Sequence, residues 1–393
     1  MALVSKASAL MHLTKLQRKF RASEAAFVVL AAIAGAVAGL LTVGQQVIAH
    51  GIQRLFYGVS INRLSALGSI HHPWKLVALP LGGLLMVLFI RWLGRRRAPI
   101  DVVEANALHG GRIPFIDNLV ISAQTILSNG VGASVGLEAA YAQMGGGFAS
   151  ILGQWFALRR NDLRTLVGAG AGAAIGAAFG APLTGAFYAF EIVIGTYSPA
   201  SVAPVMAAAL AAASVTRLIG IDPYLIATTT GRGFSIYEYL AYAALGLVCA
   251  AVGIAIMRLV TFCEQHVQGW KMLAPWRPII GGLLLIPLAL ISPQTLSAGH
   301  GALHLDLITH PALTFLAIVL ILKIAASVVS LSFGFRGGLF FASLFLGSLV
   351  GQIFAGLINL MDIGFVIDPH DAALVGMSAL SVSVVGGPMT LAI

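Results

Sequence analysis

The sequence predicts an all-α protein that crosses a membrane several times. Of its 393 residues, 59% are hydrophobic and 9% are charged, and the mean hydropathy is +0.94. Soluble domains carry about 25% charged residues, so most of this chain must lie in lipid or pack against segments that do. Apolar runs long enough to cross a bilayer recur along the chain, which is the second observation behind this multi-pass membrane class.

The basic residues fit a membrane topology better than a nucleic-acid surface. Residues 1–22 carry a basic cluster without a cleavage site after a short apolar core, so we expect a retained N-terminal segment on the cytoplasmic side. Spans at 25–48 and 75–93 would place the arginines at 91–97 on the same side, as the positive-inside rule prefers. No RNA- or DNA-binding motif accompanies the net charge of +9, so we expect no nucleic-acid partner.

Beyond residue 97 the apolar segments become shorter and are interrupted by glycine and proline. Interrupted helices leave backbone groups unpaired, which a membrane protein tolerates only inside the protein or along a watery cavity. Such segments therefore predict a binding site. Glycines at every fourth position from Gly168 to Gly180 predict a helix face that packs closely against a neighbour, and Pro182 should end that helix. Further spans are expected at 203–219, 239–260 and 279–291.

The second half of the chain echoes the first. A shift of about 200 residues places the Gly-Leu-x-x-Ala pattern that starts at Gly136 on the one that starts at Gly338, and further matches follow in the same order. We therefore expect a cytoplasmic segment at 1–22, a first membrane repeat at 23–219 and a second membrane repeat at 220–393. Broken helices at corresponding places point to a site at the repeat interface, near the middle of the bilayer.

The glycine-rich turn before Glu138 is the main candidate site in the first repeat. Glycines such as Gly136 let the backbone approach a ligand closely, and the start of a helix offers unpaired N–H groups that attract an anion. Glu138 can fill that site itself and can yield it to a dissolved anion. We therefore interpret Glu138 as the gate of an anion-conducting membrane protein.

The matching turn in the second repeat carries no acid. Its helix start offers backbone N–H groups beside an aromatic ring, at Gly337, Gly338, Leu339 and Phe340. Arg336 stands directly before this turn. Because an arginine in an apolar segment is costly, it either attracts the anion or forms a structural pair, with Asp362 or Glu138 as the candidate partners.

Other chemistry has weaker support. The histidine pairs at 71–72 and at 300 and 304 lack the carboxylate or cysteine neighbours of a metal site, and the two cysteines are too few and too deep in apolar sequence for a disulfide framework. We expect no cofactor. The sequence around Ser134 matches the Gly-x-Ser-x-Gly pattern of serine hydrolases but lacks the strand and the acid and histidine partners, so we do not expect an enzyme.

At these residues the chain resembles the CLC family of chloride channels and proton-coupled chloride transporters, from about residue 23 to its end. Gly136-Leu-Glu-Ala-Ala140 is similar to the family's Gly-(Lys/Arg)-Glu-Gly-Pro motif. The run from Gly168 to Glu191 is similar to a family signature, and the turn at 337–343 resembles the Gly-x-Phe-x-Pro anion-binding turn.

This resemblance implies an inverted repeat of tilted and broken helices, assembled as a homodimer with one pore in each subunit. It also implies that Glu138 is the gating glutamate and that the N–H groups of Leu339 and Phe340 bind chloride, with Gly136, Gly337 and Gly338 shaping the site. Chloride is then the transported ion rather than a cofactor.

Three departures from the family pattern bear on the mode of transport. Arg97 stands near the position of a serine whose hydroxyl helps to hold the central anion in the family. Aligning on Glu191 leaves Ile192 where the family's transporters carry an inner, proton-passing glutamate. The chain also ends at Ile393, so we expect the second repeat to lack the family's last helices and their anion-binding tyrosine.

We therefore expect transport of chloride or a similar small anion through a pore gated by Glu138, as a voltage- or pH-influenced passive channel. A proton-coupled antiporter and a non-conducting membrane sensor or scaffold of the same fold are the alternatives. Glu191, Ile192 and Arg97 are candidates for lining the pore or a proton path. The expected location is the inner membrane of a bacterium, surrounded by lipid and with the N-terminus in the cytoplasm.

Overall fold

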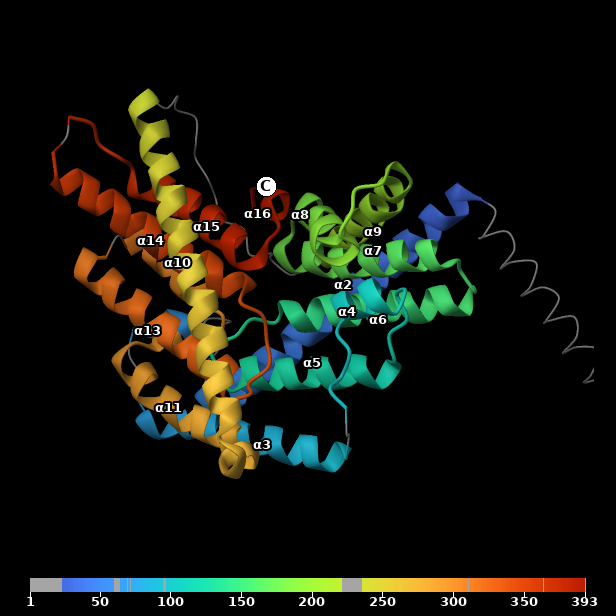
Figure 1. Ribbon diagram of the computed structural model, residues 1–393, viewed down its shortest axis with the longest axis horizontal. Coiled ribbons are helices and arrows are strands. Elements are labelled where there is room, and N and C mark those ends of the chain that lie inside the picture. Colours follow the sequence, from blue (N-terminus) through green and yellow to red (C-terminus); the bar gives the residue numbers. More distant parts are fainter. Residues whose placement is uncertain are drawn as a thin grey trace, which may run out of the picture.

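The protein is a bundle of tilted helices of very unequal length (Figure 1). The computed structural model describes residues 23–59, 64–68, 70, 72–94, 97–220, 235–309, 311–362 and 364–392. Within these ranges the chain forms helices and no β-strand, which confirms the expected all-α class. The expected cytoplasmic segment at 1–22 lies outside the described residues.

In chain order the α-helices are α2 (Glu24–Tyr57), α3 (Ala78–Leu93), α4 (Val102–Leu108), α5 (Phe115–Gly130), α6 (Glu138–Trp155), α7 (Arg160–Phe179), α8 (Pro182–Tyr188), α9 (Pro199–Leu218), α10 (Ile236–Gly269), α11 (Arg277–Ile291), α12 (His300–Thr309), α13 (Leu313–Ser332), α14 (Phe340–Leu360), α15 (Pro369–Val385) and α16 (Pro388–Ala392). Short single turns are η1 (Leu64–Ala66), η2 (Pro73–Val77), η4 (Lys271–Trp276) and η5 (Pro293–Thr295), and η3 (Ala189–Ile194) is a π-helix that continues α8.

Seven of the described helices are long and apolar enough to cross a bilayer. They are α2, α3 with its preceding turn, α9, α10, α11 with its preceding turn, α13 and α14. Several of them carry large apolar side chains on the outside of the bundle, such as Trp92, Leu218 and Leu247. A soluble protein rarely exposes so much contiguous apolar surface, so these faces are where lipid would contact the chain and the protein is a multi-pass membrane protein.

Glycines and alanines bring α2 close to α9. A Cβ placed on Gly35 would overlap the carbonyl group of Ala208, and Gly39 lies in the same way against Ala212 one turn later. The Thr42 hydroxyl is within hydrogen-bond distance of the carbonyl oxygens of Ala38 (3.0 Å) and Ala174 (3.2 Å), which also joins α2 to α7. Small residues therefore let the backbones approach closely, as is typical of helix contacts inside membranes.

The predicted glycine face of α7 packs as expected. A Cβ on Gly172 would overlap the carbonyl of Gly185 in α8, and Gly168 lies against Ile194 of η3. Gly180 has a different role, because it ends α7 in the left-handed conformation with φ of 65°, where glycine has no Cβ to strain the backbone. Pro182 then begins α8, where its missing N–H costs no helical hydrogen bond.

Two helix pairs in the two halves of the chain are built alike. α6 packs on α7 with Gly145 against Gly170, and α14 packs on α15 with Gly347 against Gly376, each glycine facing the other's carbonyl. Figure 1 shows α5, α6 and α7 on one side of the bundle and α13, α14 and α15 on the other. The arrangement agrees with two related halves, although the proposed boundaries at 23–219 and 220–393 stay a prediction.

The close contact between α2 and α9 yields a matched test. Replacing Gly35 by alanine should destabilise the protein by about 1–3 kcal/mol, because the new methyl group meets the fixed backbone of Ala208. Gly44 lies on the same helix with open space where its Cβ would be, so Gly44→Ala should change stability by no more than about 1 kcal/mol. Thermal unfolding in detergent measures both, and equal midpoints would contradict the packing argument.

Candidate functional site

The two predicted glycine turns meet each other. The N–H of Gly136 donates to the carbonyl of Gly338 (2.9 Å), and the N–H of Gly338 donates to the carbonyl of Gly136 (3.3 Å). A Cβ placed on Gly337 would lie 2.8 Å from the carbonyl oxygen of Gly136, which is closer than real Cβ contacts. Only glycine therefore permits this approach, which joins turns that lie far apart in the sequence.

Hydrogen bonds on either side of this pairing are reciprocal. The N–H of Ser134 donates to the hydroxyl of Ser330 (2.9 Å), and the N–H of Arg336 donates to the hydroxyl of Ser128 (3.0 Å). Each half thus lends a helix-terminal serine to the turn of the other half. Each of these residues in the first half has a counterpart in the second half, and the number of positions between the two is the same in every pair. The pairs are Gly136 and Gly338, Ser134 and Arg336, and Ser128 and Ser330.

The Glu138 side chain lies between the two turns at the start of α6. It is 4% exposed, and its Oε1 accepts a hydrogen bond from the N–H of Phe341 (3.2 Å). Its Oε2 has no hydrogen-bond partner in the described part of the chain, and a Cβ on Gly338 would come within 3.3 Å of it. An acid from the first half therefore caps the first turn of α14 in the second half.

The start of α14 has further hydrogen-bonding capacity for an anion. Among the described residues, the N–H groups of Leu339 and Phe340 have no acceptor, as is normal for the first turn of a helix. The Phe340 ring lies beside Phe179 (centroids 5.2 Å apart) and Tyr188 (6.3 Å). Unpaired N–H groups beside buried rings can bind an anion without placing a full positive charge in the path.

Arg336 does not form the ion pair that we considered from the sequence. Its guanidinium donates to the side-chain oxygen of Gln124 at 3.4 Å, and among the described residues it pairs with neither Glu138 nor Asp362. The structural pairing with Glu138 or Asp362 is therefore wrong, because the side chain turns towards α5 instead.

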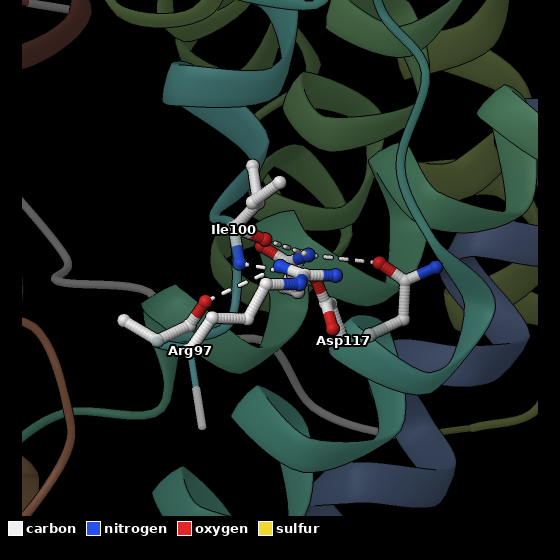
Figure 2. A network of polar contacts seen from close by, with 6 residues as sticks. Arg97, Ile100 and Asp117 are labelled. Carbon is white, nitrogen blue, oxygen red and sulfur yellow. Dashed lines mark hydrogen bonds and ion pairs between the residues drawn. The ribbon is translucent and has the colours of Figure 1, made fainter. Parts of the chain in front are cut away.

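Arg97 lies in a polar network that ties three segments together (Figure 2). Its guanidinium contacts the carboxylate of Asp117 at 3.0 Å, and the side chains are 50% and 0% exposed, respectively. The same carboxylate oxygen accepts the N–H of Ile100 (3.1 Å), and Gln143 of α6 lies within 3.4 Å of the Ile100 carbonyl. Where the related motif has a serine hydroxyl, this chain therefore has an arginine whose charge is paired with a buried acid.

Glu191 and Ile192 lie apart from the paired turns. The Glu191 carboxylate accepts the N–H groups of Met389 (3.0 Å) and Thr390 (2.9 Å) and the hydroxyl of Tyr197 (2.9 Å), so it caps α16. Ile192 is partly buried and packs against the main apolar core. The structure gives Glu191 a role in joining η3 to α16, and Ile192 offers no group that can carry a proton.

Sequence reasoning missed a buried lysine. Lys323 of α13 is 0% exposed, and its ammonium group donates to the carbonyl oxygens of Ser297 (2.6 Å) and Thr295 (3.2 Å). Three residues after Ser297, His300 stacks its ring on Phe341 with centroids 3.5 Å apart. Lys323 and Asp117 could both have been identified as candidates from the sequence, because each is a single charged residue in a largely apolar segment.

The hydrolase hypothesis finds no support in the geometry. The hydroxyl of Ser134 lies 3.1 Å from that of Ser327, and both side chains are fully buried. In the described ranges no histidine or carboxylate contacts the Ser134 hydroxyl, as activation of a serine nucleophile requires. Those ranges also contain no group of three or more histidine, cysteine or carboxylate side chains placed to hold a metal ion.

Comparison with known proteins identifies the family of this chain. Residues 82–393 match the family described as voltage gated chloride channel. A curated relative, the voltage-gated ClC-type chloride channel ClcB of Escherichia coli O157:H7 (strain EC4115 / EHEC), is 28% identical over 295 residues, which cover 73% of this chain and 70% of the relative.

Solved structures share the fold. A slow cyanobacterial Cl⁻/H⁺ antiporter matches with a TM-score of 0.79 and 22% identity, covering 93% of this chain and 87% of that one. A CLC-type fluoride/proton antiporter matches with a TM-score of 0.76 and 22% identity, covering 91% and 86%. The family model matches most of the chain, and the matched region contains both of the glycine turns that enclose Glu138. This chain therefore belongs to the CLC family of anion-transporting membrane proteins.

Proposed function

We propose that this protein exchanges chloride or a similar small anion for protons, with Glu138 as the group that both substrates use. The observation that carries the proposal is the position of the Glu138 carboxylate. It accepts a backbone N–H at the start of α14 and is buried between two glycine turns. A carboxyl group already occupies the place where a dissolved anion would find unpaired N–H groups.

The chemistry follows from competition for these donors. When ionised, Glu138 competes with the anion for the N–H groups at the start of α14. When protonated, the carboxyl group loses its charge and is a weaker acceptor, so an anion can displace it. Each proton bound therefore promotes binding of one anion, and the same side chain links the two movements.

Exchange has more support than the passive channel that we expected from the sequence. Two solved structures of the same fold are described as antiporters, one of chloride and one of fluoride, both with protons. The curated relative is described as a channel, and Ile192 at the place of an inner acid favours a channel as well. We weigh the shared fold and the buried, displaceable Glu138 more heavily, and a passive channel is the second candidate.

The location and the assembly of the protein are also proposed. The curated relative is bacterial, and the long apolar helices require a bilayer, so we place the protein in the inner membrane of a bacterium. The resemblance further implies a homodimer with one pore in each subunit and a cytoplasmic N-terminus.

The first test is flux from liposomes loaded with chloride, with chloride and pH recorded together. The exchanger predicts that chloride release, started by a potassium ionophore, is accompanied by proton uptake. Chloride release without proton movement would establish the passive channel instead. The absence of any flux in correctly folded protein would contradict the transport proposal.

Replacing Glu138 by glutamine should separate the two movements. The amide keeps the shape but can neither ionise nor carry a proton, so chloride release should continue, lose its dependence on pH and proceed without proton uptake. Glu264 of α10 is exposed and makes a suitable control, since Glu264→Gln should leave both movements as in the wild type. Retained pH dependence in Glu138→Gln would show that another residue is the gate.

Arg336 should strengthen anion binding through its charge. Replacing it by glutamine should weaken chloride binding about fivefold, roughly 1 kcal/mol, because the arginine precedes the turn whose N–H groups face Glu138. Isothermal titration calorimetry in detergent measures this, with Arg217→Gln at the exposed end of α9 as the control. Unaltered affinity would leave Arg336 only the role of fixing α5 through Gln124.

A further inference from the structure

A small cavity beside the Glu138 site is lined mainly by polar side chains. It has about 10 Å³ of space for the centre of a water molecule, which is room for one small ligand. Four of its polar side chains are more than nine-tenths buried. The polar residues that line it are His50, Gln53, Ser65, Asn129, Ser297 and His300.

The cavity touches residues that position the Glu138 carboxyl group. Leu137, the residue before Glu138, forms part of its wall. The side chain of Asn129 donates a hydrogen bond (2.8 Å) to a carbonyl oxygen of the glycine turn that precedes Glu138. From the other half of the chain, His300 stacks on Phe341, whose N–H donates to Glu138. A ligand in the cavity would therefore lie next to the site.

Every polar group of Ser297 is engaged except the proton of its hydroxyl group. Its N–H donates to the carbonyl of Gly132 (3.0 Å), and its own carbonyl accepts from Lys323 (2.6 Å). Its Oγ receives hydrogen bonds from the side-chain amides of Asn129 (2.9 Å) and Gln53 (3.3 Å). Because an amide N–H can only donate, the hydroxyl oxygen is the acceptor in both contacts. Among the described residues, none accepts the proton of this hydroxyl group.

Ser65 is in the same condition on another wall of the cavity. Its Oγ accepts the N–H groups of Gly301 (3.1 Å) and Ala302 (3.3 Å) in the first turn of α12, and its proton has no acceptor in the described part of the chain. His50 and His300 add imidazole rings, each of which carries at least one N–H in any protonation state. The cavity therefore offers hydrogen-bond donors and suits a ligand that accepts.

The charge beside the cavity favours an anion over a water molecule. The buried ammonium group of Lys323 is held by the carbonyl oxygens of Ser297 and Thr295, and within the described ranges no carboxylate pairs with it. None of the residues that line the cavity is acidic. A buried charge without a counter-charge is costly. A water molecule could accept the hydroxyl protons, but only an anion would also balance this charge.

We propose that this cavity is a further chloride site, in which one ion accepts hydrogen bonds from the hydroxyl groups of Ser65 and Ser297 and is balanced by Lys323. Binding there does not depend on the exchange of anions for protons. The role of the site does rest on the proposed anion transport: an ion held beside Glu138 would be available when the protonated carboxyl group yields its N–H donors.

The test is X-ray diffraction at long wavelength from crystals of the full chain, grown at a chloride concentration used for the flux assay. Chloride scatters anomalously under these conditions and the oxygen of water does not. We expect an anomalous peak within hydrogen-bond distance of the hydroxyl oxygens of Ser65 and Ser297. Density without an anomalous signal would identify a water molecule, and either this result or an empty cavity would overturn the proposal.

Two substitutions test the ligands separately. Ser297→Gly removes one hydroxyl group and should fold, because Ser297 has a φ of 55°, a left-handed conformation that glycine adopts without strain. Ser65→Ala removes the other hydroxyl group. Each variant should need about tenfold more chloride for the same peak height, as expected when a hydrogen bond to a charged group is lost. Unchanged peaks in both variants would overturn the assignment of the ligands.

Ser150 provides a matched control away from the cavity. Its buried Oγ also accepts two hydrogen bonds, from Ile113 (3.0 Å) and Gln154 (3.0 Å), but its proton already goes to the carbonyl of Gly111 (2.6 Å). Ser150→Ala should therefore leave the anomalous peak unchanged. Loss of the peak in this variant too would show that the peak reports general loosening of the fold, which would overturn the assignment.

Flux measured on the same protein in liposomes separates this site from the proposed function. Chloride flux in a protein whose cavity holds no chloride would overturn the site and leave the transport proposal intact. A chloride ion in the cavity of a protein that supports no flux would establish the site and contradict transport.

Discussion

The whole site depends on two helix starts being held within hydrogen-bond distance of each other. Gly136 and Gly338 exchange two backbone hydrogen bonds, and a serine from each half fixes the turn of the other. In a membrane such irregular backbone is tolerated only when its polar groups are paired inside the protein. The pairing therefore both satisfies the turns and points α6 and α14 towards one place, which is where Glu138 lies.

Close helix packing makes this arrangement possible. Lipid provides little hydrophobic force between helices, so the helices hold together through tight contacts between small residues. Gly145 with Gly170 and Gly347 with Gly376 bring each helix of the site against the helix that follows it. The helices that carry the turns are thus fixed from behind, and a site built on rigid elements can select an ion by the position of its N–H groups.

Three buried charged groups offset the cost of leaving water in different ways. Asp117 is paired with Arg97 and a backbone N–H, Lys323 donates to two carbonyl oxygens, and Glu138 accepts one backbone N–H while its second oxygen is left without a hydrogen bond in the described chain. Glu138 is therefore the least completely satisfied of the three. A group held by one hydrogen bond is easier to displace than one held by an ion pair, which suits the role proposed for Glu138 as an acid that yields its place to an anion.

The sequence by itself determined the class of protein, the glycine turns and the acid at Glu138. Apolar composition, the spacing of small residues and a lone charge at a helix start are local properties of the chain, so they can be recognised without the tertiary structure. Only the tertiary structure decided which groups meet. Arg336 turns to Gln124 rather than to an acid, Glu191 caps α16, and the Glu138 carboxylate accepts the N–H of Phe341. These contacts join residues far apart in the sequence, and they depend on how tilted helices cross, which local patterns do not encode.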